Sequence, residues 1–244
     1  MMERNGLYER AAAAGKEDQP YGNGRRPGGA DGRPSRILFV TAVEAERQAV
    51  LNGWPEARAI AAGVGPANAA AATAFALAEA ECDLVVSFGI GGGFPGRAEI
   101  GSLVLADAII AADLGAESPD GFIGLDELGF GTAAEPVDLR WHARLKAALE
   151  SEGLAVITGT ALTVSTATGT AETAALRARL APGAAVEGME GSGAAAAARM
   201  KGIPAAELRA VSNPVGPRDR AAWRIAEALQ ALETAAAALR KHLA

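Results

Sequence analysis

The stretch DLVVSFGIGGG, residues 83–93, decides the fold of this chain. Its first six residues form a short, nearly continuous apolar run, which is typical of a strand buried on both faces of a parallel sheet. The glycines that follow allow the backbone to approach a packed neighbour or a ligand closely, because they carry no Cβ atom. We therefore expect a strand at 83–88 that ends in a glycine-rich loop.

A strand-then-helix order recurs on both sides of this stretch. Strands are predicted at 36–41, 57–62, 102–110, 155–163 and 206–212, and helices at 43–51, 67–81, 137–150, 170–180, 191–200 and 218–243. Such alternation indicates an α/β fold of three αβα layers, with a central mixed, mostly parallel sheet between helices. Ligands bind such sheets at the carboxyl ends of strands. The loops after Val40, Phe88, Leu162 and Val211 are therefore the ones to inspect.

Length and composition narrow the class of protein. The chain has 244 residues, half of them apolar, and a net charge of -6, which suits one sizeable domain with an appendage. Residues 1–35 include a run of Gly, Arg, Pro, Asn and Asp that predicts a disordered tail before a domain at 36–244. No basic cluster exists for nucleic acid to bind, so a diffusible small molecule is the expected partner.

Cysteine and histidine are too few for a disulfide or a His/Cys metal site. The chain has one cysteine, Cys82, and two histidines, His142 and His242. No apolar run reaches the roughly 20 residues that a membrane span needs, and no secretion signal is recognisable. We expect a soluble protein of the reducing cytoplasm, with no metal and no contact with a membrane.

The glycines at 91–96 formally satisfy the dinucleotide-binding pattern GxGxxG. In that fingerprint a helix follows the glycines, because the helix N-terminus holds the pyrophosphate. Here residues 97–101 lead into another predicted strand. The pattern therefore favours close backbone packing over a dinucleotide site.

Polar residues follow several of the predicted strands. Glu44 and Glu46 lie where acids favourably meet a helix dipole, with Thr41 as a candidate cap, so their presence has an ordinary structural explanation. Pro, Gly and Asn are common in turns, so a turn after the strand explains much of the composition of residues 212–220. Neither explains why the polar loops share one edge of the sheet, which a common cleft would account for.

The segment 186–191, VEGMEG, places Glu187 and Glu190 in an alanine-rich, apolar part of the chain. Burying an unpaired carboxylate is strongly unfavourable. We therefore expect these acids to face something polar.

Five short motifs occur in this order: TAVEAE at 41–46, GVG at 63–65, the glycines at 89–93, the pair Met189-Glu190 and RAVSN at 209–213. Together they resemble the nucleoside phosphorylase and nucleosidase superfamily. Within it the chain is most similar to the futalosine hydrolases of menaquinone biosynthesis. The resemblance covers residues 36–243 and implies the nucleoside phosphorylase-like fold.

The resemblance also implies roles for individual residues. Glu46 takes the position of the acid that activates water, and a carboxylate there favours hydrolysis because its charge repels the phosphate that a phosphorylase binds. Met189 and Glu190 match the pair that contacts the ribose. Arg209 matches an arginine that organises the water site and that can keep Glu46 ionised. Glu187 has no counterpart, because one extra residue precedes Met189.

Two departures from the adenine-specific nucleosidases concern the base. Asn213 replaces an aspartate, and an amide can donate to N7 or O6 of a 6-oxopurine. Ile90 replaces a serine among the glycines, of which Gly89 and Gly91 are expected at the substrate. Because Asn213 is not an acid, Asp219 or water is a candidate proton source for the leaving base.

Thr166 and Thr168 align with a segment that frames the purine, although they also suit an ordinary turn after a strand. We therefore expect hydrolysis of futalosine, release of hypoxanthine, no cofactor and a homo-oligomer. The alternatives are an adenine-releasing methylthioadenosine or adenosylhomocysteine nucleosidase, a purine nucleoside phosphorylase, and a non-catalytic nucleoside-binding protein.

Overall fold

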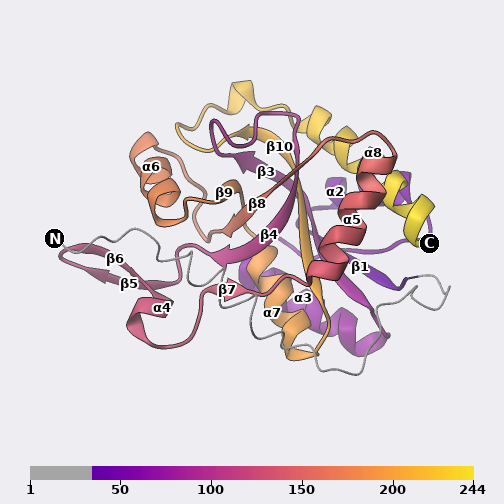
Figure 1. The fold of residues 1–244 in the computed structure, drawn as a ribbon, viewed down its shortest axis with the longest axis horizontal. Coiled ribbons are helices and arrows are strands. Elements are labelled where there is room, and N and C mark those ends of the chain that lie inside the picture. The colour runs from indigo at the N-terminus through magenta and orange to yellow at the C-terminus, as the bar shows by residue number, and fades with distance from the viewer. Residues whose placement is uncertain (1–34) are drawn as a thin grey trace.

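A computed structural model describes residues 35–244 (Figure 1). The tail predicted at 1–35 thus lies almost wholly outside the described residues. The strands are β1 Ile37–Thr41, β2 Arg58–Ala61, β3 Leu84–Gly93, β4 Leu103–Ala111, β5 Gly115–Ser118, β6 Gly121–Gly124, β7 Ala134–Glu135, β8 Val156–Thr163, β9 Ala184–Gly188 and β10 Ala205–Pro214. The helices are α2 Glu44–Gly53, α3 Pro66–Glu79, α4 Leu125–Leu128, α5 Leu139–Ser151, α6 Ala171–Leu180, α7 Gly191–Met200, the 3-10 helix η1 Arg220–Ala222 and α8 Ile225–Leu243.

The fold is α/β, as predicted, with a mixed sheet between two groups of helices. The sheet order is β10-β4-β8-β9-β3-β1-β2, and β7 pairs with β4. An additional parallel pairing joins β10 to β3, so five strands form a closed ring from which β1 and β2 extend. The ring is the part of the sheet that sequence periodicity does not reveal, because it depends on pairing between distant strands.

Strand β3 is longer than predicted, because it continues through the glycines that the sequence analysis assigned to a loop. Its first half pairs with β1, from Leu84 to Ser87, and its end pairs with β9 through Gly92 and Gly93. β10 accompanies it from Val85 to Gly93. Before the glycines β3 pairs with β1, and at their end it pairs with β9. The sheet therefore opens between β1 and β9.

Two apolar cores lie on the two sides of the sheet. One holds α2, α5 and α8 around Phe39, whose ring meets Trp54 and Phe88 edge-to-face at centroid distances of 5.7 and 5.4 Å. The other holds α3 and α7. Gly193 lets these two helices touch, since a Cβ atom there would lie 2.0 Å from the Pro66 carbonyl oxygen. α6, at the left in Figure 1, packs against a third, smaller apolar cluster that includes Phe94 and Leu162.

Two further expectations, one boundary and one helix cap, are wrong. The closing helix begins at Ile225 and not at residue 218, because η1 and the extended residue Trp223 precede it. Thr41 does not cap α2; its hydroxyl donates to the carbonyl of Ile60 at 3.0 Å, and Val43 is the N-cap residue. Strand β9 and the elements from β5 to β7 were not predicted from the sequence.

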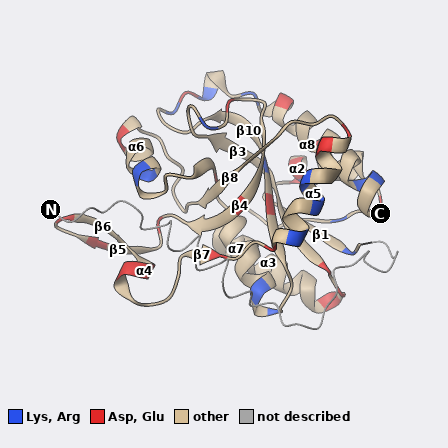
Figure 2. Cartoon of the chain, viewed as in Figure 1, with Lys and Arg blue, Asp and Glu red and all other residues tan. Residues whose placement is uncertain are grey.

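No helix among residues 35–244 is long and apolar enough to cross a membrane. Charged residues lie mainly on the outer helices and loops, as the coloured ribbon in Figure 2 shows. Buried acids are therefore exceptional, and three of them, Glu46, Glu190 and Glu207, mark the candidate site.

Candidate active site

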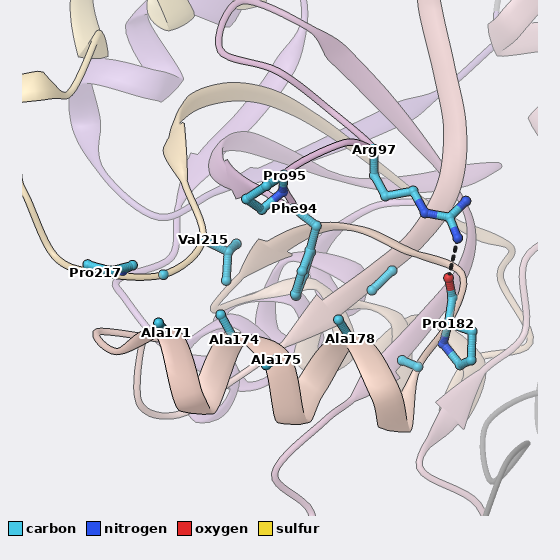
Figure 3. Close-up of a pocket in the computed structure, with 13 residues that line it drawn as sticks. Phe94, Pro95, Arg97, Ala171, Ala174, Ala175, Ala178, Pro182, Val215 and Pro217 are labelled. Atoms are coloured by element: carbon cyan, nitrogen blue, oxygen red, sulfur yellow. Dashed lines mark hydrogen bonds between the residues drawn. The ribbon is translucent and has the colours of Figure 1, made fainter.

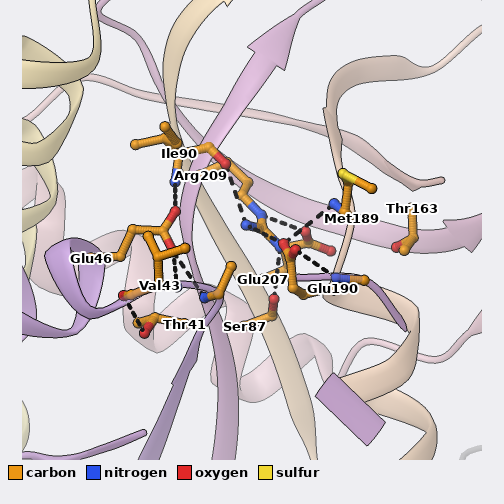
Figure 4. Close-up of polar contacts among 12 residues, drawn as sticks. Thr41, Val43, Glu46, Ser87, Ile90, Thr163, Met189, Glu190, Glu207 and Arg209 are labelled. Atoms are coloured by element: carbon orange, nitrogen blue, oxygen red, sulfur yellow. Dashed lines mark hydrogen bonds and ion pairs between the residues drawn. The ribbon is translucent and has the colours of Figure 1, made fainter. Parts of the chain in front are cut away.

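Four buried charged side chains meet where β3 leaves β1 (Figure 4). Glu46 comes from the first turn of α2, Glu190 from the junction of β9 and α7, and Glu207 and Arg209 from β10. All four are at most 4% exposed. The structure thus brings together Glu46, Glu190 and Arg209, which the sequence analysis selected, and adds Glu207, which it did not.

Glu46 is held by backbone amides from two elements. Its Oε2 accepts from the N–H groups of Ala42 at 2.8 Å and Val43 at 3.2 Å, which is the helix-start role that acids at this position commonly have. Its Oε1 accepts from the N–H of Ile90 on β3 at 2.9 Å. The second contact goes beyond helix capping, since it fixes the carboxylate over the sheet.

Gly89 is required for this arrangement. A Cβ atom at residue 89 would lie 2.6 Å from Glu46 Oε1 and 2.8 Å from Arg209 Nη1. The glycine therefore makes room for two protein side chains. Gly91 similarly makes room for the backbone of β9, because a Cβ atom there would lie 2.8 Å from the carbonyl oxygen of Glu187. These contacts identify packed neighbours as the reason for both glycines.

Arg209 is the centre of the cluster. Its Nε donates to Glu207 Oε1 at 2.7 Å, its Nη2 to Ser87 Oγ at 2.9 Å and its Nη1 to the carbonyl of Ile90 at 3.3 Å. Nη1 also forms an ion pair with Glu190 Oε2 at 3.2 Å. Burial by itself lowers the pKa of the guanidinium, but the surrounding carboxylates outweigh burial and raise that pKa above its ordinary value.

Glu190 links the cluster to the turn that precedes α3. Its Oε1 accepts from the N–H of Gly65 at 3.3 Å, and its Oε2 accepts from the N–H of Met189 at 3.3 Å. These bonds are long compared with the 2.9 Å typical of proteins. Met189 is half-buried and lies beside Glu190 in Figure 4. The carboxylate therefore keeps hydrogen-bonding capacity that the protein does not use fully.

Glu187 lies on β9, and its carboxylate contacts residues outside this cluster. Its carboxylate accepts from the N–H of Thr168 at 2.8 Å and from the Thr168 hydroxyl at 2.5 Å, and it is ion-paired with Arg177 of α6. Arg177 also donates to the Thr168 hydroxyl at 2.6 Å and to the Thr166 carbonyl at 3.1 Å. Glu187 therefore fastens the loop after β8 to α6.

This arrangement bears on the two threonines that were expected at the base. The Thr166 side chain is exposed, and the Thr168 hydroxyl is already engaged by Glu187 and Arg177. Their observed contacts are those of an ordinary turn that a buried ion pair holds in place.

Asn213 lies near the end of β10, after a β-bulge in the pairing with β3. Its Oδ1 accepts from the Ser212 hydroxyl at 2.8 Å, and its Nδ2 donates to the Pro214 carbonyl at 3.0 Å. The side chain is half-buried, so the second Nδ2 hydrogen can reach a ligand. Asp219 is exposed, and its carboxylate caps η1 by accepting from the N–H of Ala221 at 3.1 Å.

Glu207 is the charged residue of the cluster that the sequence analysis missed. It is fully buried, and burial raises the pKa of its carboxyl group, although Arg209 opposes the shift. Its Oε2 has no hydrogen-bond partner among residues 35–244. A usable signal existed, because residues two apart on a strand face the same side and Arg209 was already selected.

A separate concave region lies beside the loop after Asn213 (Figure 3). This cavity of about 470 Å³ is lined mainly by apolar residues of α6, of the turn after β3 and of residues 215–217. Arg97 borders it and donates to the Pro182 carbonyl at 2.9 Å. None of the four clustered charged residues lines this cavity. Within the described residues, no group of acids, His and Cys could hold a metal ion.

Known proteins similar in sequence are futalosine hydrolases. Residues 37–244 match the phosphorylase superfamily. The futalosine hydrolase of Streptomyces coelicolor is 51% identical, over 82% of this chain and 92% of that protein. The futalosine hydrolase of Thermus thermophilus is 38% identical, over 72% of this chain and 77% of that protein.

Solved structures agree with the fold at lower identity. A 5'-methylthioadenosine/S-adenosylhomocysteine nucleosidase of Colwellia psychrerythraea, in complex with adenine, superposes with a TM-score of 0.73 at 20% identity, over 86% of this chain and 96% of that one. A futalosine hydrolase mutant of Helicobacter pylori gives 0.74 at 15% identity, over 86% and 100%. The resemblance noted in the sequence is confirmed: the chain belongs to the phosphorylase superfamily and, within it, to the futalosine hydrolases.

Proposed function

We propose that this protein hydrolyses the N-glycosidic bond of futalosine and releases hypoxanthine, with water as the only co-reactant. The observation that carries the proposal is the convergence of Glu46, Glu190 and Arg209 at the opening between β1 and β9. Membership of the futalosine hydrolases supports the substrate. The role of each residue follows from its unused hydrogen-bonding capacity.

Glu46 acts as the general base. An ionised carboxylate has about four lone-pair positions, and three backbone N–H groups occupy three of them. The remaining position accepts a proton from water, whose oxygen bonds to the anomeric carbon. As that bond forms, the electron pair of the C–N bond leaves with the purine. Backbone amides hold the carboxylate in place, so little reorganisation is needed.

Glu190 holds the ribose. Its bonds to the protein are long, so sugar hydroxyls can donate to the same oxygens, while Met189 packs on the sugar. Positive charge develops on the sugar as the C–N bond breaks, and a buried carboxylate stabilises that charge. Arg209 balances part of the negative charge, but most of its N–H groups are engaged by the protein. Glu46 would therefore repel a phosphate, and Arg209 has few N–H groups left to bind one. This favours water as the nucleophile.

Asn213 recognises the base. Ser212 fixes Oδ1 as an acceptor, so Nδ2 is the group left to donate to N7 or O6 of a 6-oxopurine. An amide cannot release a proton to the leaving base. Because Asp219 is exposed and caps η1, we assign protonation of the base to water.

The decisive assay follows base release from futalosine by the purified protein, with and without phosphate. We expect hypoxanthine to appear at a rate independent of phosphate, and faster than adenine from methylthioadenosine. A rate that depends on phosphate would identify a phosphorylase. Preferential adenine release would identify an adenine nucleosidase, and nucleoside binding without release would identify a non-catalytic binding protein.

Glu46→Gln tests the base directly. We expect it to lower kcat by about 10²- to 10⁴-fold, the range usual for loss of a general base. Glu44→Gln is the matched control, since Glu44 lies on the same turn of α2 but is exposed and pairs with Arg47. Full activity of Glu46→Gln would contradict the mechanism, whatever the substrate.

We also propose a homo-oligomer of the cytoplasm. Phe75 of α3 and Met200 of α7 are 74% and 82% exposed, and they belong to helices that pack side by side. Large exposed apolar side chains of this kind favour an interface. Cys82 is buried as a free thiol, which suits a reducing compartment. Light scattering of wild-type protein and of Phe75→Glu would reveal the oligomer and its loss.

A further inference from the structure

Three carboxylates surround a single guanidinium in the candidate active site. Glu207 and Glu190 contact Arg209 directly, and the charge of Glu46 acts on it from the side of α2. If all three acids were ionised, the cluster would carry two uncompensated negative charges in a buried place. Uncompensated buried charge is strongly unfavourable, so one acid is expected to hold a proton.

Glu207 is the acid whose surroundings least suit a charge. Glu46 accepts three backbone N–H bonds, and Glu190 accepts two in addition to its ion pair. Glu207 accepts only from Arg209, through Oε1, and its Oε2 has no hydrogen-bond partner among the described residues. An anionic oxygen without a donor costs more to bury than a neutral hydroxyl.

The space around Oε2 leaves little room for water on the side of α7. A Cβ atom at Gly191, the first residue of α7, would lie 1.9 Å from Glu207 Oε2. The oxygen is therefore packed against the backbone at the start of this helix, where the helix dipole favours an anion, but none of the described N–H groups donates to it. Gly191 admits the carboxyl group to this position, as Gly89 admits Glu46.

The charged groups that face Glu207 are Arg209 on its own strand and Glu190 at the start of α7. Burial raises the pKa of Glu207 most, Arg209 opposes that rise, and Glu190 adds to it. Arg209 cannot compensate Glu207 fully, because the same guanidinium is shared with Glu190 and Glu46. The charge balance and the packing therefore point to the same protonation state.

We propose that Glu207 keeps its proton in the resting protein and acts as a positioning residue for Arg209. Its Oε1 holds Nε, so the guanidinium is oriented to reach Ser87 and Glu190. Because Glu207 is neutral, it does not compensate the positive charge of Arg209. That charge therefore acts on Glu46 and Glu190, the two carboxylates that face the substrate. Ionisation of Glu207 would draw that charge away from Glu190 and weaken the hold on the ribose.

The first test reads the proton without any substrate. Infrared spectra of the substrate-free protein are recorded from neutral to alkaline pH. We expect the C=O stretching band of a buried carboxylic acid at neutral pH, lost as pH rises, and absent in Glu207→Gln but present in the surface control Glu44→Gln. Persistence of the band in Glu207→Gln, or its absence from the wild-type protein at neutral pH, would overturn the proposal.

The second test uses kinetics and rests on the proposed function. Glu207→Leu removes the acceptor for Nε, and we expect it to lower kcat/KM by about 10²-fold or more. Glu207→Gln keeps an acceptor of the same shape and is neutral, so it should restore most of that loss. We expect kcat/KM of the wild-type protein to decline at alkaline pH as Glu207 ionises, and we expect this decline to be absent from Glu207→Gln.

Equal losses in the Gln and Leu variants, or an unchanged alkaline decline in Glu207→Gln, would contradict the assigned role. If the Leu variant does not fold, the comparison of Gln with wild type still decides the case through the pH profile. If the wild-type protein does not hydrolyse futalosine, the proposed function is wrong, whereas the infrared result still reports on Glu207.

Discussion

Two buried ionic clusters each include an acid from the short segment 187–190, and they differ in the balance of negative and positive charge. The first joins Glu46, Glu190 and Glu207 to Arg209, and the second joins Glu187 to Arg177. In the second, one carboxylate meets one guanidinium and a threonine, so it is balanced within the protein. In the first, acids outnumber the cation. Excess charge at a buried site is costly unless a ligand uses it, which separates a chemical site from a structural one.

The largest difference is expected when each arginine is replaced. Arg209→Met leaves two carboxylates, Glu46 and Glu190, without their cation and removes the donor to Glu207, whereas Arg177→Met leaves one carboxylate. Breaking a buried ion pair costs about 3–5 kcal/mol of stability. We expect Arg209→Met to fall at or beyond the top of that range and to lose activity, and Arg177→Met to fall at the lower end. Urea unfolding of both variants checks the order, and equal losses would remove the distinction.

The two neighbouring acids provide the next comparison. Glu190→Gln should lower kcat/KM by about 10²-fold with little change in Tm, because its role is to stabilise charge on the substrate. Glu187→Gln should instead lower Tm, because Glu187 fastens the loop after β8. Its kcat should stay within about threefold of the wild-type value, and any larger kinetic effect should appear in KM. Kinetics and thermal melts of the pair, side by side, test this division. A large fall in kcat for Glu187→Gln would place it in the chemistry.

The pH dependence of stability should distinguish the clusters as well. The pKa of Glu207 is raised in the folded protein, so the folded state binds this proton more tightly than the unfolded state does. Its contribution to stability is thus full below the ordinary glutamate pKa of about 4.3 and is lost as pH rises toward the folded value. We expect a downward slope of unfolding free energy with pH that is absent from Glu207→Gln. An identical slope in both proteins would show that Glu207 does not cause it.

The smallest effect is expected at Ser212, which belongs to neither cluster. Ser212→Ala removes the 2.8 Å bond that orients the Asn213 amide. A single neutral hydrogen bond contributes about 1 kcal/mol, so kcat/KM should fall only severalfold. Discrimination between futalosine and methylthioadenosine should weaken in the same proportion. An unchanged ratio would mean that Ser212 does not orient the amide for the base.

The sequence predicted what periodicity and order along the chain can reveal. The strand at 83–88 and the helix at 191–200 were found because their apolar patterns are local. Strand β3 was ended too early, because glycine disfavours strands in isolation and only pairing with β9 and β10 carries it to Gly93. Strand β9 was missed because its alanines and Glu187 have no alternation to read.

The site was predicted in part for the same reason. Glu46, Glu190 and Arg209 were selected by their places in an ordered set of motifs, and the fold brings them together. Glu207 was overlooked although it shares a strand face with Arg209. Asp219 was selected by its chemistry alone, but in the structure it caps a short helix at the surface. Chemistry without position is thus a weak guide to a site.

The closed ring of β3, β10, β4, β8 and β9 bears on how this protein can change over evolution or by engineering. In a closed ring, a one-residue insertion in any strand shifts register against two neighbours at once and turns side chains to the opposite face. An insertion in β10 would therefore displace Glu207 and Arg209 together from the cluster. The segment from 215 to 224 lies outside the ring. We expect new substrate preferences to be acquired most easily there, by changes in length that leave the proposed catalytic carboxylates in place.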